Sequence, residues 1–315
     1  YDAQRPLVID RVFAWHTFLG SGGSDSCQGI AVDGSGNVYV GGYSNATWGS
    51  PVNTFAGAND AFAAKLNSSG ALQWNTFLGS GGNDDFCNGI AVDGSGNVYL
   101  GGESSANWGS PVNAFAGGNE AFATKLNSSG ALQWNTFLGS GSYDLCTGIA
   151  VDGSSDIYVS GRSNANWGSP VNAFNAGDDG FAAKLDSSGV RQWHTFMGSG
   201  GFDLCKGIAV DISGNVYVGG QSSAPWGTPI NAHAGGSDGF TTKLNSSGTR
   251  LWHSFLGSGG NSSCYRLAVD GSSNVYVCGF SNITWGNPVH AHSGGIEGFT
   301  AKLNSSGAPQ WHTFL

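Results

Sequence analysis

Short runs of alternating side chains recur along this chain, each interrupted by a cluster of turn-forming residues. In the run GIAVDGSGNVYVGG at 29–42, Ile30 and Val32 flank a small alanine, and Val38 and Val40 flank a tyrosine. A two-residue period is typical of a β-strand. The DGSGN segment between the two halves supplies residues that adopt positive φ or bond to their own backbone. The run therefore predicts a β-hairpin.

The hairpin run returns four more times, and a segment that begins with tryptophan accompanies each copy. The later hairpins read GIAVDGSGNVYLGG, GIAVDGSSDIYVSG, GIAVDISGNVYVGG and RLAVDGSSNVYVCG. The accompanying tryptophans follow one another at intervals of 59 or 60 residues and are Trp15, Trp74, Trp134, Trp193, Trp252 and Trp311. A period of this length indicates a repeat architecture.

Each repeat predicts four strands. The hairpin supplies two, a segment like AFAAKLN at 61–67 supplies the third, and a segment like ALQWNTFLG at 71–79 supplies the fourth. No segment shows a helical period with caps. We therefore predict an all-β fold, a β-propeller of five four-stranded antiparallel blades with about 59 residues per repeat. A linear β-solenoid is the alternative, but its repeats are usually shorter and its strands parallel.

The predicted propeller is a single domain over 1–315 that consists of an N-terminal strand at 1–20 and five repeats. The repeats cover about 21–79, 80–139, 140–198, 199–257 and 258–315. Because the last repeat already has a fourth strand, the N-terminal strand is surplus to the count. We expect it to close the ring within the molecule. The alternatives are displacement of the last strand, a place outside the last blade, or exchange with another molecule.

The chain carries little charge, which narrows its partners. Charged residues make up 10% of it, the net charge is −9, and lysine and arginine together number 12. This balance argues against a nucleic-acid partner and against anionic lipid, and it suits a surface that packs on a neighbour. No apolar run is long enough for a transmembrane helix, so we expect no membrane insertion. The chain begins at Tyr1, and we expect an exported protein whose signal is not present in this sequence.

Four motifs resemble the bacterial SBBP-type β-propeller repeat. They are GSGG, GIAVDGSGNVYVGG, WGSPVNAFAGG and DAFAAKLNSSGALQWNTFLG. The resemblance covers about Trp15 to Leu315 in five copies. It implies a propeller fold and an extracellular or cell-surface setting, because the family typically occurs in large exported or surface proteins. The family is named for seven-bladed propellers, and this chain departs from that with five repeats. The resemblance supplies no catalytic residue.

A second set of tryptophans, one in each loop between the second and third strands, forms the candidate ligand-binding site. An aromatic face beside asparagines and backbone amides suits a sugar, because the C–H face stacks while the hydroxyls bond to polar groups. Five copies would add avidity. The alternative is that these rings fill space between blades. The candidates are Trp48, Trp108, Trp167, Trp226 and Trp285.

Cysteine also recurs once per repeat, just before the hairpin. A sixth cysteine, Cys278, lies in the second strand of the last repeat. Reflection across the hairpin turn brings it near Cys264, which makes this pair a candidate disulfide. One cysteine per repeat is not a C-x-x-C metal motif. The aspartate that opens each hairpin turn lacks the further acids of a calcium loop and predicts an Asx-type turn. We therefore expect neither a metal site nor a cofactor.

Two functions fit these observations. The first is a non-enzymatic exported or cell-surface propeller that binds glycans or a surface partner through the tryptophan loops. The alternative is a structural subunit of an extracellular fibre, sheath or layer, which self-associates through low-charge blades and the N-terminal strand. An enzyme is not expected, because catalysis needs unlike groups at one place and the repeats are nearly identical.

Overall fold

The computed structural model describes residues 14–315, which form twenty β-strands in five four-stranded sheets. The first two sheets contain β1 (Asp25–Val32), β2 (Val38–Ser44), β3 (Asp60–Leu66), β4 (Leu72–Leu78), β5 (Asp85–Val92), β6 (Val98–Ser104), β7 (Glu120–Leu126) and β8 (Leu132–Leu138). The third and fourth contain β9 (Asp144–Val151), β10 (Ile157–Ser163), β11 (Asp179–Leu185), β12 (Arg191–Met197), β13 (Asp203–Val210), β14 (Val216–Ser222), β15 (Asp238–Leu244) and β16 (Arg250–Leu256). The fifth contains β17 (Ser262–Val269), β18 (Val275–Ser281), β19 (Glu297–Leu303) and β20 (Pro309–Phe314). Within this part of the chain, no helix is long and apolar enough to cross a membrane.

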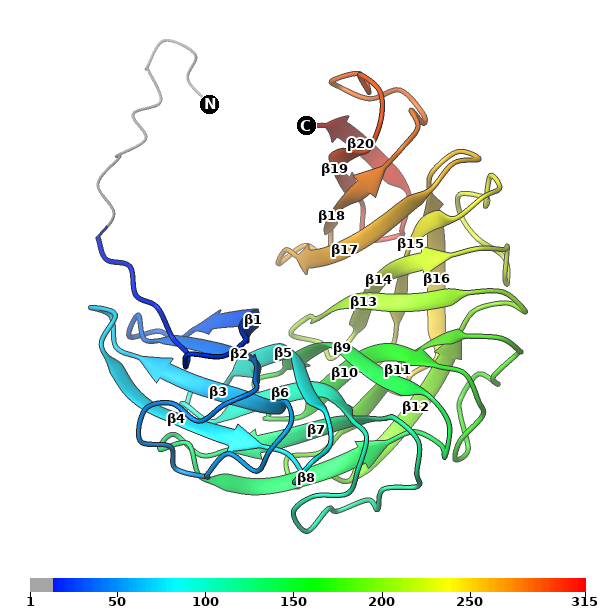
Figure 1. The fold of residues 1–315 in the computed structure, drawn as a ribbon. Helices are drawn as coiled ribbons and strands as arrows, with labels where there is room; N and C mark the ends of the chain where they lie inside the picture. Colours follow the sequence, from blue (N-terminus) through cyan, green and yellow to red (C-terminus); the bar gives the residue numbers. More distant parts are fainter. Residues whose placement is uncertain (1–13) are drawn as a thin grey trace.

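The sheets are propeller blades, arranged side by side around an axis (Figure 1). In every blade the strands lie in sequence order and pair antiparallel. The first strands of successive blades lie next to one another, so they are the innermost strands. The prediction of an all-β propeller with five four-stranded antiparallel blades is confirmed.

The hairpin turn forms as its sequence predicts. Val32 pairs with Val38, and Asp33 opens the turn between them. The Asp33 Oδ1 atom accepts hydrogen bonds from the backbone amides of Ser35 and Asn37 at 2.9 and 3.0 Å. Its Oδ2 atom accepts from the hydroxyl of Tyr39 at 3.0 Å. The carboxylate therefore holds both the turn and the second strand, and the predicted Asx-type turn is confirmed.

Neighbouring blades share their hydrophobic core. We call the face that a blade presents to the preceding blade its leading face, and the opposite one its trailing face. On the leading face of the second blade, Cys87 and Ile90 are buried against Tyr39, Ala61 and the rest of the first blade's trailing face. The same combination recurs at the following junctions. Each blade thus depends on its neighbour for burial, as in other repeat proteins.

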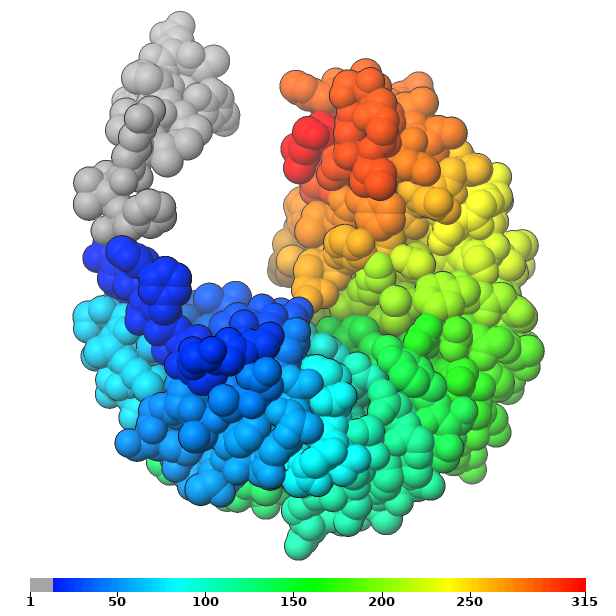
Figure 2. Space-filling model, in the orientation of Figure 1, coloured from blue at the N-terminus to red at the C-terminus, as the bar shows by residue number. Residues whose placement is uncertain are grey.

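The ring is open. Among residues 14–315, no other blade covers the leading face of the first blade or the trailing face of the last (Figure 2). Among the described residues no strand of the first blade pairs with one of the last, so the predicted closure within the molecule is wrong for this part of the N-terminal segment. The remainder of the predicted N-terminal strand, residues 1–13, lies outside the described residues.

Residues 15–21 take the place of the fourth strand of a preceding blade, although they form no strand. The indole of Trp15 donates to the Ser68 carbonyl at 3.0 Å, as Trp74 does to Ser128 across the first junction. The ring lies so close to Gly70 that a Cβ built there would be 2.6 Å from it, and the positive φ of Gly70 also favours glycine. The segment is therefore held by the first blade, not by the last.

Candidate functional site

The five loop tryptophans do not form an exposed platform. They are buried in every blade, with exposed fractions between 5% and 8%. Phe181 and Phe196 make T-shaped contacts with Trp167, and His194 stacks on it with ring centroids 4.0 Å apart. These rings therefore do not offer the exposed face that sugar binding needs, and the alternative, in which they fill space in the core, is the arrangement observed, because the loop folds back onto its own blade. The residues concerned are Trp48, Trp108, Trp167, Trp226 and Trp285.

A side chain on the fourth strand fixes each loop tryptophan. In the third blade the Nε2 atom of His194 lies 2.7 Å from the Trp167 carbonyl. In the first blade the amide of Asn75 donates to the Trp48 carbonyl at 2.8 Å. Asparagine and histidine can alternate here because each offers one donor at the same place. Burial lowers the pKa of His194 to about 4, so the ring is neutral near neutral pH and Nε2 carries the proton.

A pocket of about 290 Å³ lies where the innermost strands converge. Residues from all five blades line it. In the first four blades they include the residue that directly follows the periodic cysteine, and in the last blade they include Arg266, which is two residues after Cys264. The position directly after the cysteine holds a different residue in every repeat: Gln28, Asn88, Thr147, Lys206 and Tyr265. Chemically different side chains therefore do meet at the axis. Alignment of the five repeats with one another would have identified this variable position from the sequence.

The axial pocket is positively charged in an otherwise acidic protein. Among its lining residues, Lys206 and Arg266 are charged and no carboxylate is present. Arg266 donates to the Lys206 carbonyl at 3.1 Å, and the Lys206 ammonium lies 4.0 Å from the ring centroid of Tyr265. Burial, with a smaller contribution from the charge of Arg266, lowers the pKa of Lys206 to about 8. The arrangement can therefore accept a small anion.

Carboxylates face one another across the blade junctions. Asp60 and Asp85 are both fully buried, and their Oδ1 atoms have no hydrogen-bond partner. Both lie against Gly79, where a built Cβ would be 3.1 Å from Asp60 and 2.5 Å from Asp85. Burial raises the pKa of Asp85 to about 6, and the charge of Asp60 contributes to the rise. The next junction pairs Glu120 with Asp144 in the same way.

The candidate disulfide between Cys264 and Cys278 does not form in the structure. Both residues are free thiols; Cys264 is buried and Cys278 is exposed. Cys264 pairs with Gly279 across the hairpin, while Cys278 is opposite Arg266 beyond a bulge. Because neighbouring positions on a strand point to opposite faces, the two thiols lie on different faces of the sheet.

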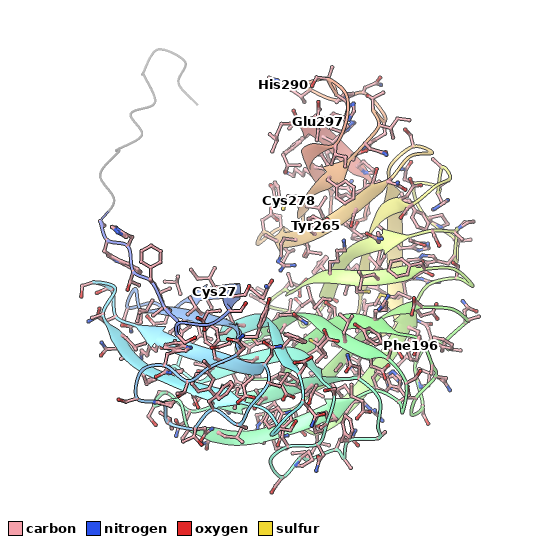
Figure 3. The ribbon with its side chains drawn as sticks, in the orientation of Figure 1. Cys27, Phe196, Tyr265, Cys278, His290 and Glu297 are labelled. Carbon is pink, nitrogen blue, oxygen red and sulfur yellow. The ribbon has the colours of Figure 1, made fainter. Side chains whose placement is uncertain are left out.

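The uncovered blade faces are the second candidate site. On the leading face of the first blade, Ile30 is 69% exposed, whereas its counterpart Ile90 is 8% exposed. On the last blade, Trp311, Phe314 and Leu315 line an apolar groove of about 470 Å³. Figure 3 shows Cys27 on one side of the opening and Tyr265 and Cys278 on the other. Sequence reasoning could not identify these faces, because their residues match those of buried junctions.

Several solved structures are similar to this chain. A crystal structure of glucose dehydrogenase is 11% identical, with 82% of this chain and 80% of that chain covered and a TM-score of 0.43. The apocarotenoid oxygenase of Synechocystis is 10% identical, with 94% and 66% covered and a TM-score of 0.47. The Pan2 WD40 domain of Neurospora crassa is 10% identical, with 92% and 88% covered and a TM-score of 0.36. No curated protein matches the sequence.

The expectation that this chain is not an enzyme has to be corrected. The solved structures to which this chain is similar include two enzymes, glucose dehydrogenase and apocarotenoid oxygenase. At these identities the likeness concerns the fold alone.

The repeat itself is matched by a family model. The model described as a beta-propeller repeat, SBBP, matches residues 14–47, 73–107, 133–166 and 192–225. Each match runs from the tryptophan-led segment through the following hairpin, so it spans the junction between two blades. The chain therefore contains copies of the SBBP β-propeller repeat, as its motifs predict.

Proposed function

We propose that this protein is an assembly module whose copies dock head to tail, the trailing face of the last blade against the leading face of the first blade of the next copy. The observation that carries the proposal is the exposure of junction residues at both ends of the arc. On the leading face Ile30 is 69% exposed whereas its counterpart Ile90 is 8% exposed, and on the trailing face of the last blade Trp311 is 38% exposed. Contiguous exposed apolar surface of this kind typically marks an interaction site.

The internal junctions indicate what covers these faces. Every leading face in the interior is covered by the trailing face of the preceding blade. Because all blades have nearly the same sequence, the two uncovered faces are complementary halves of one such junction. A second copy supplies that complement.

Docking requires an exchange of tryptophans. Residues 15–21 already lie where β20 of the incoming copy would pack, so Trp15 and the incoming Trp311 compete for the socket at Ser68 and Gly70. Trp311 is 38% exposed in the single chain. Trp15→Ala should therefore strengthen association, and Trp311→Ala should weaken it.

The contact joins two different surfaces, so each added copy leaves a new free face. Figure 2 shows that the opening is narrower than the arc itself. A second copy therefore cannot lie wholly in the same plane, and successive copies must rise along the axis. This geometry supports the alternative of a fibre or layer; an extracellular or surface setting stays a prediction.

Replacement of Ile30 by aspartate tests the proposal. A carboxylate in the docked junction would be desolvated without a partner, which costs several kcal/mol. We expect Ile30→Asp to abolish concentration-dependent association in analytical ultracentrifugation while the circular dichroism spectrum is unchanged.

The matched control is Ile212→Asp, because Ile212 is fully exposed on a hairpin turn away from both end faces. This variant should associate like the unmodified chain. Equal association by the two aspartate variants would refute docking through the leading face.

A second function, binding of a small anion in the axial pocket, is favoured by the pairing of Lys206 and Arg266 there. Carboxylates and phosphates share the chemistry, so citrate and inorganic phosphate would be titrated separately by calorimetry. Arg266→Gln should weaken the binding of either anion about tenfold or more, as expected for loss of a charged hydrogen bond. The control Gln28→Ala leaves both cations in place. Binding that Arg266→Gln does not change would exclude this pocket.

A further inference from the structure

At the internal junctions, a cysteine of one blade touches a fixed position on the preceding blade. That position is Gly41 at the first junction and Gly101 at the second. A Cβ built on Gly41 would lie 2.8 Å from the Cys87 sulfur. A Cβ built on Gly101 would lie 2.5 Å from the Cys146 sulfur and 3.7 Å from its Cβ. The usual Cβ···Cβ separation in a disulfide is about 3.5–4.5 Å. A cysteine at this position would therefore be placed to bond to the next blade's cysteine.

The last blade carries a cysteine at that position. Alignment of VYVGG, VYLGG, IYVSG, VYVGG and VYVCG puts Cys278 where the other blades have glycine or serine. Its pairing opposite Arg266 matches the pairing of Gly41 opposite Gly29. Cys278 thus lies on the uncovered trailing face, and Cys27 occupies the matching place on the uncovered leading face. These two thiols are exposed, whereas the other four cysteines are buried.

We propose that Cys278 of one copy forms a disulfide with Cys27 of the next copy and locks the head-to-tail junction. The inference rests on the proposed docking of blade faces, and it specifies the covalent contact that docking permits. Figure 3 shows both residues at the opening of the arc. The disulfide would cross-link copies in series, because each copy keeps one free thiol at either end.

The bond needs an oxidant, and a small disulfide such as oxidised glutathione supplies it. The thiolate of one cysteine attacks the small disulfide and releases one reduced thiol. The thiolate of the other then attacks the mixed disulfide, forms the Cys278–Cys27 bond and releases the second thiol. Two protein thiols are oxidised, one small disulfide is reduced, and both protons pass to the solvent or the released thiolates. Burial raises the pKa of Cys27, and the nearby Asp25 raises it further, so oxidation is best run in mildly alkaline buffer.

The test uses two variants that complement each other. Cys27→Ser and Cys278→Ser are each oxidised alone and then as an equimolar mixture, and the products are analysed by non-reducing electrophoresis and peptide mass spectrometry. We expect a ladder of linked species from the unmodified chain and no linked species from either variant alone. The mixture should give a dimer that contains the Cys278–Cys27 peptide and nothing larger, because each copy then has one reactive thiol.

A linked dimer from Cys27→Ser alone would overturn the proposal, because it would join two copies of Cys278. So would an unlinked mixture while the reduced chain still associates in the ultracentrifuge; in that case docking stands and the disulfide fails. Absence of association by the reduced chain would instead refute docking itself.

The geometric premise can be checked within one chain. Gly101→Cys should oxidise with Cys146 inside the molecule, and Gly41→Cys should do so with Cys87, each with the mass loss of two hydrogens. Failure of both folded variants to oxidise would contradict the disulfide geometry on which the proposal depends.

Discussion

Trp167→Ala is expected to lower the free energy of unfolding by about 3–5 kcal/mol, the usual loss for a large buried aromatic side chain. The ring is 5% exposed and holds the loop between β10 and β11 against its blade. Its removal would empty the space between Phe181 and Phe196 and leave His194 without the ring on which it stacks. Urea unfolding followed by circular dichroism would measure the loss.

Trp311→Ala is the matched control. It removes a tryptophan from the outermost strand of the last blade, where the ring is 38% exposed and no following blade covers it. We expect a loss of about 1 kcal/mol or less, because partly exposed side chains contribute little. Similar losses for the two variants would contradict the assignment of the loop tryptophans to the core.

Asp85→Asn is expected to stabilise the protein in alkaline solution. Burial, together with the charge of Asp60, raises the pKa of Asp85 to about 6 in the folded state, against 3.8 ordinarily. An acid whose pKa is raised on folding stabilises the folded state only while it is protonated. The contribution of Asp85 to stability is therefore fully present below pH 3.8 and is lost as the pH rises through about 6. Asparagine cannot ionise. We therefore expect Asp85→Asn to gain on the order of 2 kcal/mol at pH 8 and to gain nothing at pH 3.5.

His194 makes stability depend on pH in the opposite sense. Because the variant and the unmodified chain both contain His194, comparing the two proteins at each pH removes its effect. Burial lowers the pKa of the His194 ring to about 4, so the contribution of this ring to stability is lost as the pH falls from 6.5 through about 4.

Asp25→Asn is the control, because residues 15–21 bring no carboxylate to that end of the first blade. At the last junction Ser262 already replaces the second acid, facing Asp238. An equal gain for Asp85→Asn at both pH values would rule out ionisation as the cause.

The local pattern of the chain predicts most of the fold. The alternation of Ile30 and Val32 with Val38 and Val40 predicts the hairpin, and the register Ile30 with Val40 is the one observed. Asp33 closes the turn as its sequence context indicates. The predictions hold because strand period and turn chemistry act within a few residues, and repetition of the signal removes the ambiguity of any single copy.

The sequence left ligand binding and core packing open for the loop tryptophans, because it does not show which way a loop folds. Trp167 and a sugar-stacking tryptophan have the same neighbours in sequence. The difference is made by His194, 27 residues away, which bonds to the Trp167 carbonyl and covers the ring. Such a contact depends on tertiary packing.

The open ring also lies beyond sequence reasoning. Ile30 and Ile90 occupy the same place in nearly identical hairpins, yet one is exposed and the other buried. Burial of a blade face is a property of its neighbour and not of the blade. The axial position differs in this respect, because the variation from Gln28 to Lys206 is visible once the repeats are aligned.

Sedimentation of the reduced, unmodified chain over a concentration series tests the central claim most directly. Head-to-tail docking predicts that the weight-average mass rises steadily above the 32.2 kDa of one chain as concentration increases, without a plateau at the dimer, because the contact leaves a free face at each end. A single species of 32.2 kDa at every concentration would contradict the assignment of the uncovered blade faces as docking surfaces.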